Sequence, residues 1–184
     1  MERHDLRHAS WNRVFELIKQ PNRDRCYALY EAHRVAMDEA RGSKGKHQAW
    51  SGGYLDHVCE TVGIAEKMYE TLYLMRPHLG FDLSDAALVL YVHDLEKPFK
   101  HQEKDGRIID APGLDTKDGR KKFVLDLLGK FEIELTESQL TAFMYIEGEG
   151  SDYNPYRRVQ NELGAFCQCC DTISARIWYQ YPKA

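Results

Sequence analysis

The segment that most constrains the fold is residues 85–92 (DAALVLYV), in which every residue after the aspartate is apolar. Ser84 precedes this segment and is predicted to cap a short helix there. A helix that is apolar on all sides has to be surrounded by other elements. The segment is therefore predicted to lie at the centre of the molecule, and the rest of the chain must cover it.

Most of the remaining chain shows the apolar period of amphipathic helices and not the alternation of strands. The glycines of residues 42–53 predict a loop, and the polar residues 95–119 predict a long loop with a small hairpin at Asp105-Gly106. The expected fold is an all-α, single-domain helical bundle, since 184 residues suit one domain. Helices are expected at 10–19, 24–41, about 55–76 and 120–131, at a capping box opening at Thr136, and from Asn154-Pro155 to Ile177.

The net charge, the hydropathy pattern and the cysteines exclude several classes of function. The net charge is −4, which gives no electrostatic footprint for duplex nucleic acid. No apolar run approaches the ~20 residues of a membrane span, and the charged start of the chain does not resemble a signal peptide. The five cysteines are odd in number and three of them crowd into residues 167–170, which favours small buried thiols and a reducing, cytoplasmic location.

Two ionisable residues, His93 and Asp94, directly follow the apolar helix. Burying them unpaired would cost several kcal/mol, and a metal cation is a natural partner for an imidazole beside a carboxylate. His57, near the start of the preceding long helical pattern, and Asp171, on the flank of the last one, are further candidates. The alternative from the pattern alone is a set of unrelated hydrogen-bonded polar residues.

The order H…HD…D in a helical chain of this size resembles the HD-domain superfamily of metal-dependent phosphohydrolases. Residues 46–57 (KHQAWSGGYLDH) look like the family's H-H-x-x-x-G-G-L-x-x-H stretch, and residues 91–98 (YVHDLEKP) resemble its H-D-L-G-K-P variant. Residues 169–176 (CCDTISAR) resemble its closing helix. The similarity spans residues 46–177, so the predicted organisation is an HD domain at 46–184 behind a helical N-terminal extension at 1–45.

By this resemblance, one divalent cation would be held by His57, His93, Asp94 and Asp171. Two nitrogen and two oxygen ligands suit Mn, Fe, Co, Ni or Zn, so the metal is not specified. The family members with two metals carry further histidines before the last aspartate, whereas this chain has none after His101. A mononuclear site is therefore favoured over a di-iron oxygenase site.

The chain departs from the family pattern at Glu96, where the family has glycine, and at Gln48, where it has a second histidine. A loop residue facing water is the favoured interpretation of Glu96, and a general acid or base is its alternative. Lys97 matches the family's lysine and is expected either to contact a substrate phosphate or to lie on the surface. Glu147 is a candidate ligand or proton-transfer group, and the alternative is that it is an ordinary acidic loop residue.

Substrate contacts are predicted from two segments. Tyr153, Arg157 and Arg158 are expected at a helix N-terminus, where an aromatic ring could stack on a base and cations could hold phosphate. Ordinary capping with solvated arginines is the slightly favoured interpretation. His47 is a substrate-binding candidate, and Lys46 before it could add positive charge.

The function predicted from these residues is hydrolysis of a phosphoester or phosphoanhydride in a small phosphorylated substrate, most plausibly a nucleotide. Glu96, Lys97 and Glu147 are the catalytic candidates. Two alternatives are a single-strand 3'-5' exoribonuclease of the HD type and a non-catalytic nucleotide-binding HD protein. Residues 1–45 are a candidate lid or dimerisation element, so a homodimer is also considered.

Overall fold

The apolar segment forms helix α5 (Leu83–Val92), and its residues from Ala86 to Val92 are all buried, as the sequence predicts for a central helix. The structure, a computed structural model, describes residues 3–104 and 107–178. Helix α5 is capped by Asp82 and not by Ser84, because the Asp82 and Asp85 side chains each accept the other residue's backbone N–H. The Ser84 hydroxyl instead accepts the backbone N–H of Lys19.

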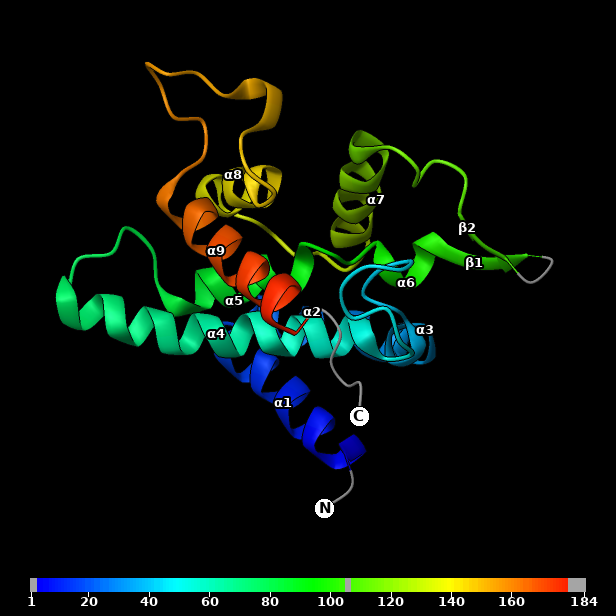
Figure 1. Cartoon of the computed structure of the whole chain (residues 1–184). Coiled ribbons are helices and arrows are strands. Elements are labelled where there is room, and N and C mark those ends of the chain that lie inside the picture. The colour runs from blue at the N-terminus through cyan, green and yellow to red at the C-terminus, as the bar shows by residue number, and fades with distance from the viewer. Residues whose placement is uncertain (1–2, 105–106, 179–184) are drawn as a thin grey trace.

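The described chain is the predicted all-α, single-domain bundle with one small two-stranded hairpin (Figure 1). Around α5, the elements in chain order are α1 (Arg3–Leu17), α2 (Asn22–Ala32), α3 (Arg34–Glu39), α4 (Gly53–Met75), α6 (Lys97–Lys100), β1 (His101–Lys104), β2 (Arg107–Asp110), α7 (Lys117–Lys130), α8 (Glu137–Tyr145), a 3-10 turn (Gly150–Asp152) and α9 (Glu162–Ile177).

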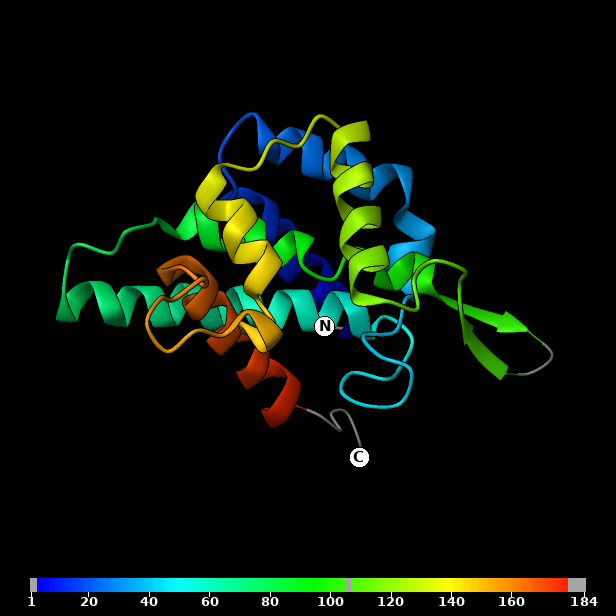
Figure 2. The ribbon, with the colours of Figure 1, turned by 90° about the horizontal axis from the view of Figure 1, so that it is seen from above.

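Helix α4 spans the molecule and packs against α1, α5 and α9 (Figures 1 and 2). Helices α8 and α9 pack on one another and on α5, so the central helix is enclosed by α1, α4, α8 and α9. The β1–β2 hairpin projects away from this helical body. No helix within the described ranges combines the length and the apolar character needed to cross a membrane.

The N-terminal helices are part of the same hydrophobic core as the rest of the chain. Trp11 of α1 is 1% exposed, and its ring lies 6.4 Å from that of Tyr54 on α4 and 5.8 Å from that of Tyr91 on α5, measured between centroids. The Tyr91 hydroxyl donates a hydrogen bond to the backbone carbonyl of Cys26 on α2. Residues 1–45 were predicted as a helical extension; their described helices contribute directly to the core.

Two connections differ from the sequence-based expectation. The helix expected over residues 24–41 is divided at His33, whose ring packs edge-on against Phe99 and Phe131. The expected long loop at 95–119 contains α6 and the β1–β2 hairpin, whose last pair is Lys104 with Arg107. The turn predicted at Asp105-Gly106 lies outside the described residues. The capping box at Thr136 is confirmed, with Gln139 as its reciprocal partner.

The last helix begins later than predicted. Asn161, not Asn154, caps α9, and its side chain accepts the backbone N–H of Gly164. Asn154 instead accepts the backbone N–H of Tyr156, two residues on, which closes an Asx turn. An Asn-Pro pair is compatible with a turn or a helix start, so the sequence pattern alone could not separate them.

Candidate metal centre

The centre begins where α5 ends. His93 follows the buried helix, and its ring Nδ1 lies 2.7 Å from the carbonyl oxygen of Leu90 in the preceding turn. A carbonyl oxygen can only accept, so Nδ1 carries the hydrogen and the neutral ring presents an unprotonated Nε2. The His93 side chain is 4% exposed, so few water molecules can satisfy that nitrogen.

Helix α4 supplies the second histidine. The fully buried His57 places Nδ1 2.9 Å from the hydroxyl of Ser174 on α9 and turns Nε2 towards His93. The two Nε2 atoms lie 3.4 Å apart. With tetrahedral geometry, two imidazole nitrogens bound to one Zn²⁺ at 2.0–2.1 Å are about 3.4 Å apart. The spacing of the two histidines therefore fits a single shared cation.

Two carboxylates lie beside these nitrogens. Asp94 Oδ2 is 3.6 Å from His57 Nε2 and 3.5 Å from His93 Nε2, and the donor atoms of these three residues all lie within 4.8 Å of one another. Asp171, from the middle of α9, places Oδ1 3.0 Å from His57 Nε2 and 3.9 Å from His93 Nε2. The fold thus brings together all four residues that the resemblance implies as ligands.

The opposite charges of Asp94 and His93 shift each other's pKa values. Burial opposes ionisation of Asp94, but the positive charges of Lys97 and the nearby histidines outweigh it and lower the pKa of its carboxyl. For His93, burial favours the neutral ring, yet the charges of Asp94 and Asp171 raise its pKa. A partly buried carboxylate pair held ionised next to imidazole nitrogens is the donor chemistry that a first-row divalent cation prefers.

Glu96 is buried, so the favoured interpretation of a loop residue facing water is wrong. It is 4% exposed, and its carboxylate lies 3.9 Å from the guanidinium of Arg120 on α7. Burial, with the neighbouring charge of Asp94, raises the pKa of Glu96 to about 7. Lys97 is also turned inwards, with Nζ 3.7 Å from Asp94 Oδ1 and only 16% of its side chain exposed.

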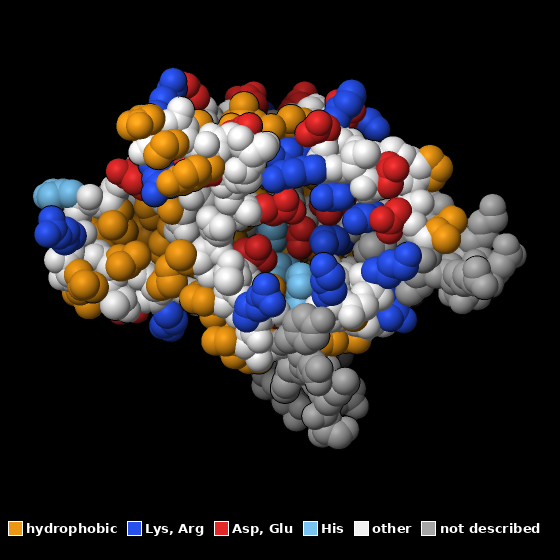
Figure 3. Space-filling view, turned by 45° about the horizontal axis from the view of Figure 1, so that its top comes forward, with side chains coloured by type: hydrophobic (Ala, Val, Ile, Leu, Met, Phe, Trp, Pro, Cys, Tyr) orange, Lys and Arg blue, Asp and Glu red, His pale blue; other side chains and the backbone are white. Residues whose placement is uncertain are grey.

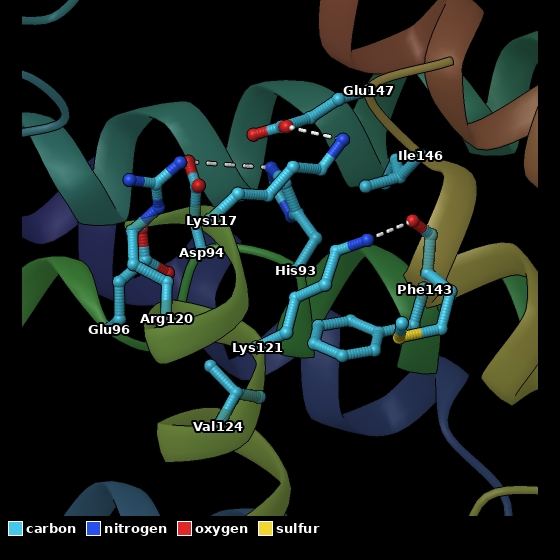
Figure 4. Close-up of a pocket in the computed structure, with 11 residues that line it drawn as sticks. His93, Asp94, Glu96, Lys117, Arg120, Lys121, Val124, Phe143, Ile146 and Glu147 are labelled. Carbon is cyan, nitrogen blue, oxygen red and sulfur yellow. Dashed lines mark hydrogen bonds and ion pairs between the residues drawn. The ribbon is translucent and has the colours of Figure 1, made fainter. Parts of the chain in front are cut away.

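A cationic wall, which the sequence does not predict, lines one side of the centre. Lys117, Arg120 and Lys121 project from one face of α7 into a small cavity that His93 and Asp94 also line (Figure 4). Their spacing of three and four residues puts them on one helical face. The sequence KDGRK after a capping threonine carries that spacing, but nothing in it indicates which element the face will meet.

Glu147 faces the same cavity from the segment after α8. Its carboxylate pairs with Lys117 at 3.2 Å, and more than half of the side chain is exposed. Lys121 donates to the backbone carbonyl of Met144. Glu147 is thus a wall residue with a cationic partner, and it is not among the three residues of the closest donor group.

A second, roomier hollow borders the donor group at Asp171. It is lined by Lys46, His47, Asp171, Thr172, Ala175 and Arg176. The His47 ring lies 5.1 Å from that of His57, centroid to centroid. Figure 3 shows histidine and acidic side chains at the floor of a depression whose rim carries lysine and arginine side chains.

The other predicted substrate residues lie elsewhere. Arg158 pairs with Glu149 at 3.0 Å and lies over the Tyr153 ring, and Arg157 is exposed in the same irregular segment before α9. None of Tyr153, Arg157 and Arg158 is among the described residues lining the two hollows beside the donor group. The helix N-terminus on which their prediction depended is at residue 162 instead.

The fold and the site together define an all-α protein with a candidate metal centre. Comparison with protein-family models, with curated proteins and with solved structures gives no match. The assignment to the HD superfamily therefore stays a prediction from the sequence motifs.

Proposed function

We propose that this protein is a metal-dependent phosphohydrolase of the HD type that acts on a small phosphorylated substrate. The observation that carries the proposal is the pair of buried imidazoles with facing Nε2 atoms, flanked by two carboxylates and by the cations of α7. A divalent cation held by His57, His93, Asp94 and Asp171 would supply Lewis-acid stabilisation of phosphoryl oxygens and a water of lowered pKa.

The surrounding residues have complementary roles in this proposal. Lys97 and Arg120 lie where cations can neutralise the charge that a phosphoryl group carries in the transition state, and such neutralisation accounts for most of the rate acceleration in phosphoryl transfer. Glu96, at the cavity wall beside Arg120, is the favoured proton-transfer group because it is buried next to the donor atoms. Glu147 is the less favoured candidate, since its carboxylate is exposed and already paired with Lys117.

The same cavity has an apolar side, which favours an organic group next to the phosphate. Val124, Phe143 and Ile146 line it opposite the cations. A cavity with a few convergent charges and an apolar wall suits a phosphorylated organic molecule, such as a nucleotide.

The test combines metal content with hydrolysis. His93→Ala and Asp94→Ala should each lose the bound cation and lose turnover of a panel of nucleotides and phosphoesters, while helical circular dichroism persists. His78→Ala, which changes an exposed histidine away from the site, is the matched control and should behave as wild type. Unchanged hydrolysis in both site variants would refute the proposal.

The second hollow favours one alternative function, a single-strand 3'-5' exoribonuclease. Lys46 and Arg176 line it next to Asp171, and no ion pair links either cation to another described residue. A substrate with phosphates on both sides of the centre would use both hollows. Faster turnover of a short oligonucleotide than of mononucleotides, lost on Lys46→Ala with Arg176→Ala, would favour this function. A protein that binds metal but hydrolyses neither would instead be the non-catalytic nucleotide binder.

A further inference from the structure

A half-buried carboxylate behind the centre connects to two of its histidines. Glu60 lies on α4, one turn after His57, and does not itself contact the donor group. One of its oxygens, Oε2, accepts the hydroxyl of Ser174 at 2.8 Å and the side-chain amide of Gln48 at 2.7 Å. Each of these partners contacts a different histidine.

The first branch leads to His57. An ionised carboxylate only accepts hydrogen bonds, so the single hydroxyl hydrogen of Ser174 is directed to Glu60. The Ser174 oxygen can then only accept from His57 Nδ1, 2.9 Å away. The neutral His57 ring therefore carries its hydrogen on Nδ1, and Nε2, 3.0 Å from Asp171 Oδ1 and facing His93, is the nitrogen that can bind a cation.

The second branch leads to His47. Because the Gln48 amide nitrogen donates to Glu60, the amide oxygen faces His47 Nδ1 at 2.7 Å and accepts from it. His47 is therefore also fixed with its hydrogen on Nδ1. Gln48 is fully buried with a φ of 44°, and its backbone is enclosed so closely that a Cβ on Gly53 would lie 2.0 Å from its carbonyl oxygen.

We propose that Glu60 is a positioning residue that sets the tautomers of His57 and His47 through Ser174 and Gln48, and thereby tunes the cation affinity of the centre. Hydrogen-bonded partners of ligating histidines typically contribute 10–100-fold to metal affinity, by orienting the ring and increasing its basicity. The part concerning affinity rests on the proposed metal-binding function; the part concerning tautomers does not.

Glu60→Leu is the decisive variant. Glu60 also borders an apolar groove with Ile64 and Met68, so leucine should be accommodated there. Without the carboxylate, the Ser174 hydroxyl is free to donate to His57 Nδ1, which favours the Nε2–H tautomer. We expect long-range ¹H–¹⁵N spectra of the metal-free protein to show His57 leaving the Nδ1–H form, with a smaller change at His47 because the Gln48 amide nitrogen also donates to the Ser174 carbonyl at 3.3 Å. Mn²⁺ or Zn²⁺ affinity should fall 10–100-fold.

Three further variants separate positioning from a structural role. Ser174→Ala should alter the tautomer of His57 but not that of His47, since the Gln48 amide loses only its 3.3 Å contact to the Ser174 hydroxyl and keeps Glu60 and the Ser174 carbonyl as acceptors. Glu60→Gln retains an acceptor and should recover part of the affinity. Glu70→Gln, an exposed residue of the same helix, is the matched control and should change nothing.

The part of the proposal that concerns tautomers and the part that concerns cation affinity can be refuted independently. If Glu60→Leu keeps both histidines in the Nδ1–H form, or loses stability without a tautomer change, the positioning role is refuted. If the wild type binds no divalent cation, the proposed metal-binding function fails, while the spectra of the metal-free protein still decide the role of Glu60.

Discussion

Replacing Lys97 by glutamine should strengthen cation binding and weaken hydrolysis. Lys97 Nζ lies 3.7 Å from Asp94 Oδ1, so an incoming cation has to compete with the ammonium for that carboxylate. Two unit charges about 4 Å apart interact by ~1 kcal/mol in water and by ~4 kcal/mol at an effective dielectric constant of 20. Taking the lower limit, Lys97→Gln should bind Mn²⁺ about fivefold more tightly. In the proposed function turnover should fall, because the variant lacks the ammonium that would neutralise the phosphoryl group.

Lys100→Gln provides the control for this experiment. Lys100 also lies on α6 and also forms a mostly buried ion pair, at 3.6 Å to Asp110, away from the donor group. Calorimetric titration of the metal-free proteins with Mn²⁺ measures affinity, and a phosphoester assay at saturating Mn²⁺ measures turnover. Weaker Mn²⁺ binding by Lys97→Gln, or turnover equal to that of the Lys100→Gln protein, would contradict the reasoning.

One further prediction concerns the backbone beside the site, and another concerns the hydrogen bonds of Glu149 in the segment before α9. Gly53→Ala should lower the free energy of unfolding by about 2 kcal/mol or more in thermal or urea denaturation, because the added Cβ would lie 2.0 Å from the carbonyl oxygen of Gln48. Gly63→Ala, in open space on the same helix, should instead be neutral or stabilising by up to ~1 kcal/mol. Backbone hydrogen bonds from Gln160 and Val159 lower the pKa of Glu149. These bonds are therefore complete above the usual glutamate pKa and are lost as the pH falls through the lowered value. The protection factor of the Val159 amide, the exchange rate of an unprotected amide at the same pH divided by its own, should fall in that acidic window and, in Glu149→Gln, already at neutral pH. Unchanged protection in the variant would refute the tether.

The helical architecture could be predicted because its signals are local. The apolar run before His93 indicates a central helix, and the Thr136 capping box marks a helix start at the observed residue. The late start of α9 could not be predicted, because the Asn154-Pro155 pattern does not distinguish an Asx turn from a helix cap. The same ambiguity explains why Arg157 and Arg158 were predicted at a helix N-terminus, whereas they lie in the irregular segment before α9.

The candidate ligands could be found from their order along the chain, but their environment could not. The polar sequence around Glu96 predicts a solvated loop residue, and only the tertiary packing of α7 against it explains its burial. In the sequence Gln48 is a departure from a histidine pair, whereas in the structure its amide links Glu60 to His47. Both features depend on which distant elements meet, and residue spacing does not specify that.

The net charge of −4 is compatible with an anionic substrate because the charges around the centre are already balanced locally. In the described structure, Lys117 is paired with Glu147, Arg120 with Glu96, and Lys97 with Asp94. A phosphate entering the cavity would therefore exchange with existing carboxylate partners and would not simply add to a positive field. Of the three pairs, the one with Glu147 is the most exposed and thus the least costly to open. Affinity for the substrate should then depend more on these local pairs than on the overall charge of the chain.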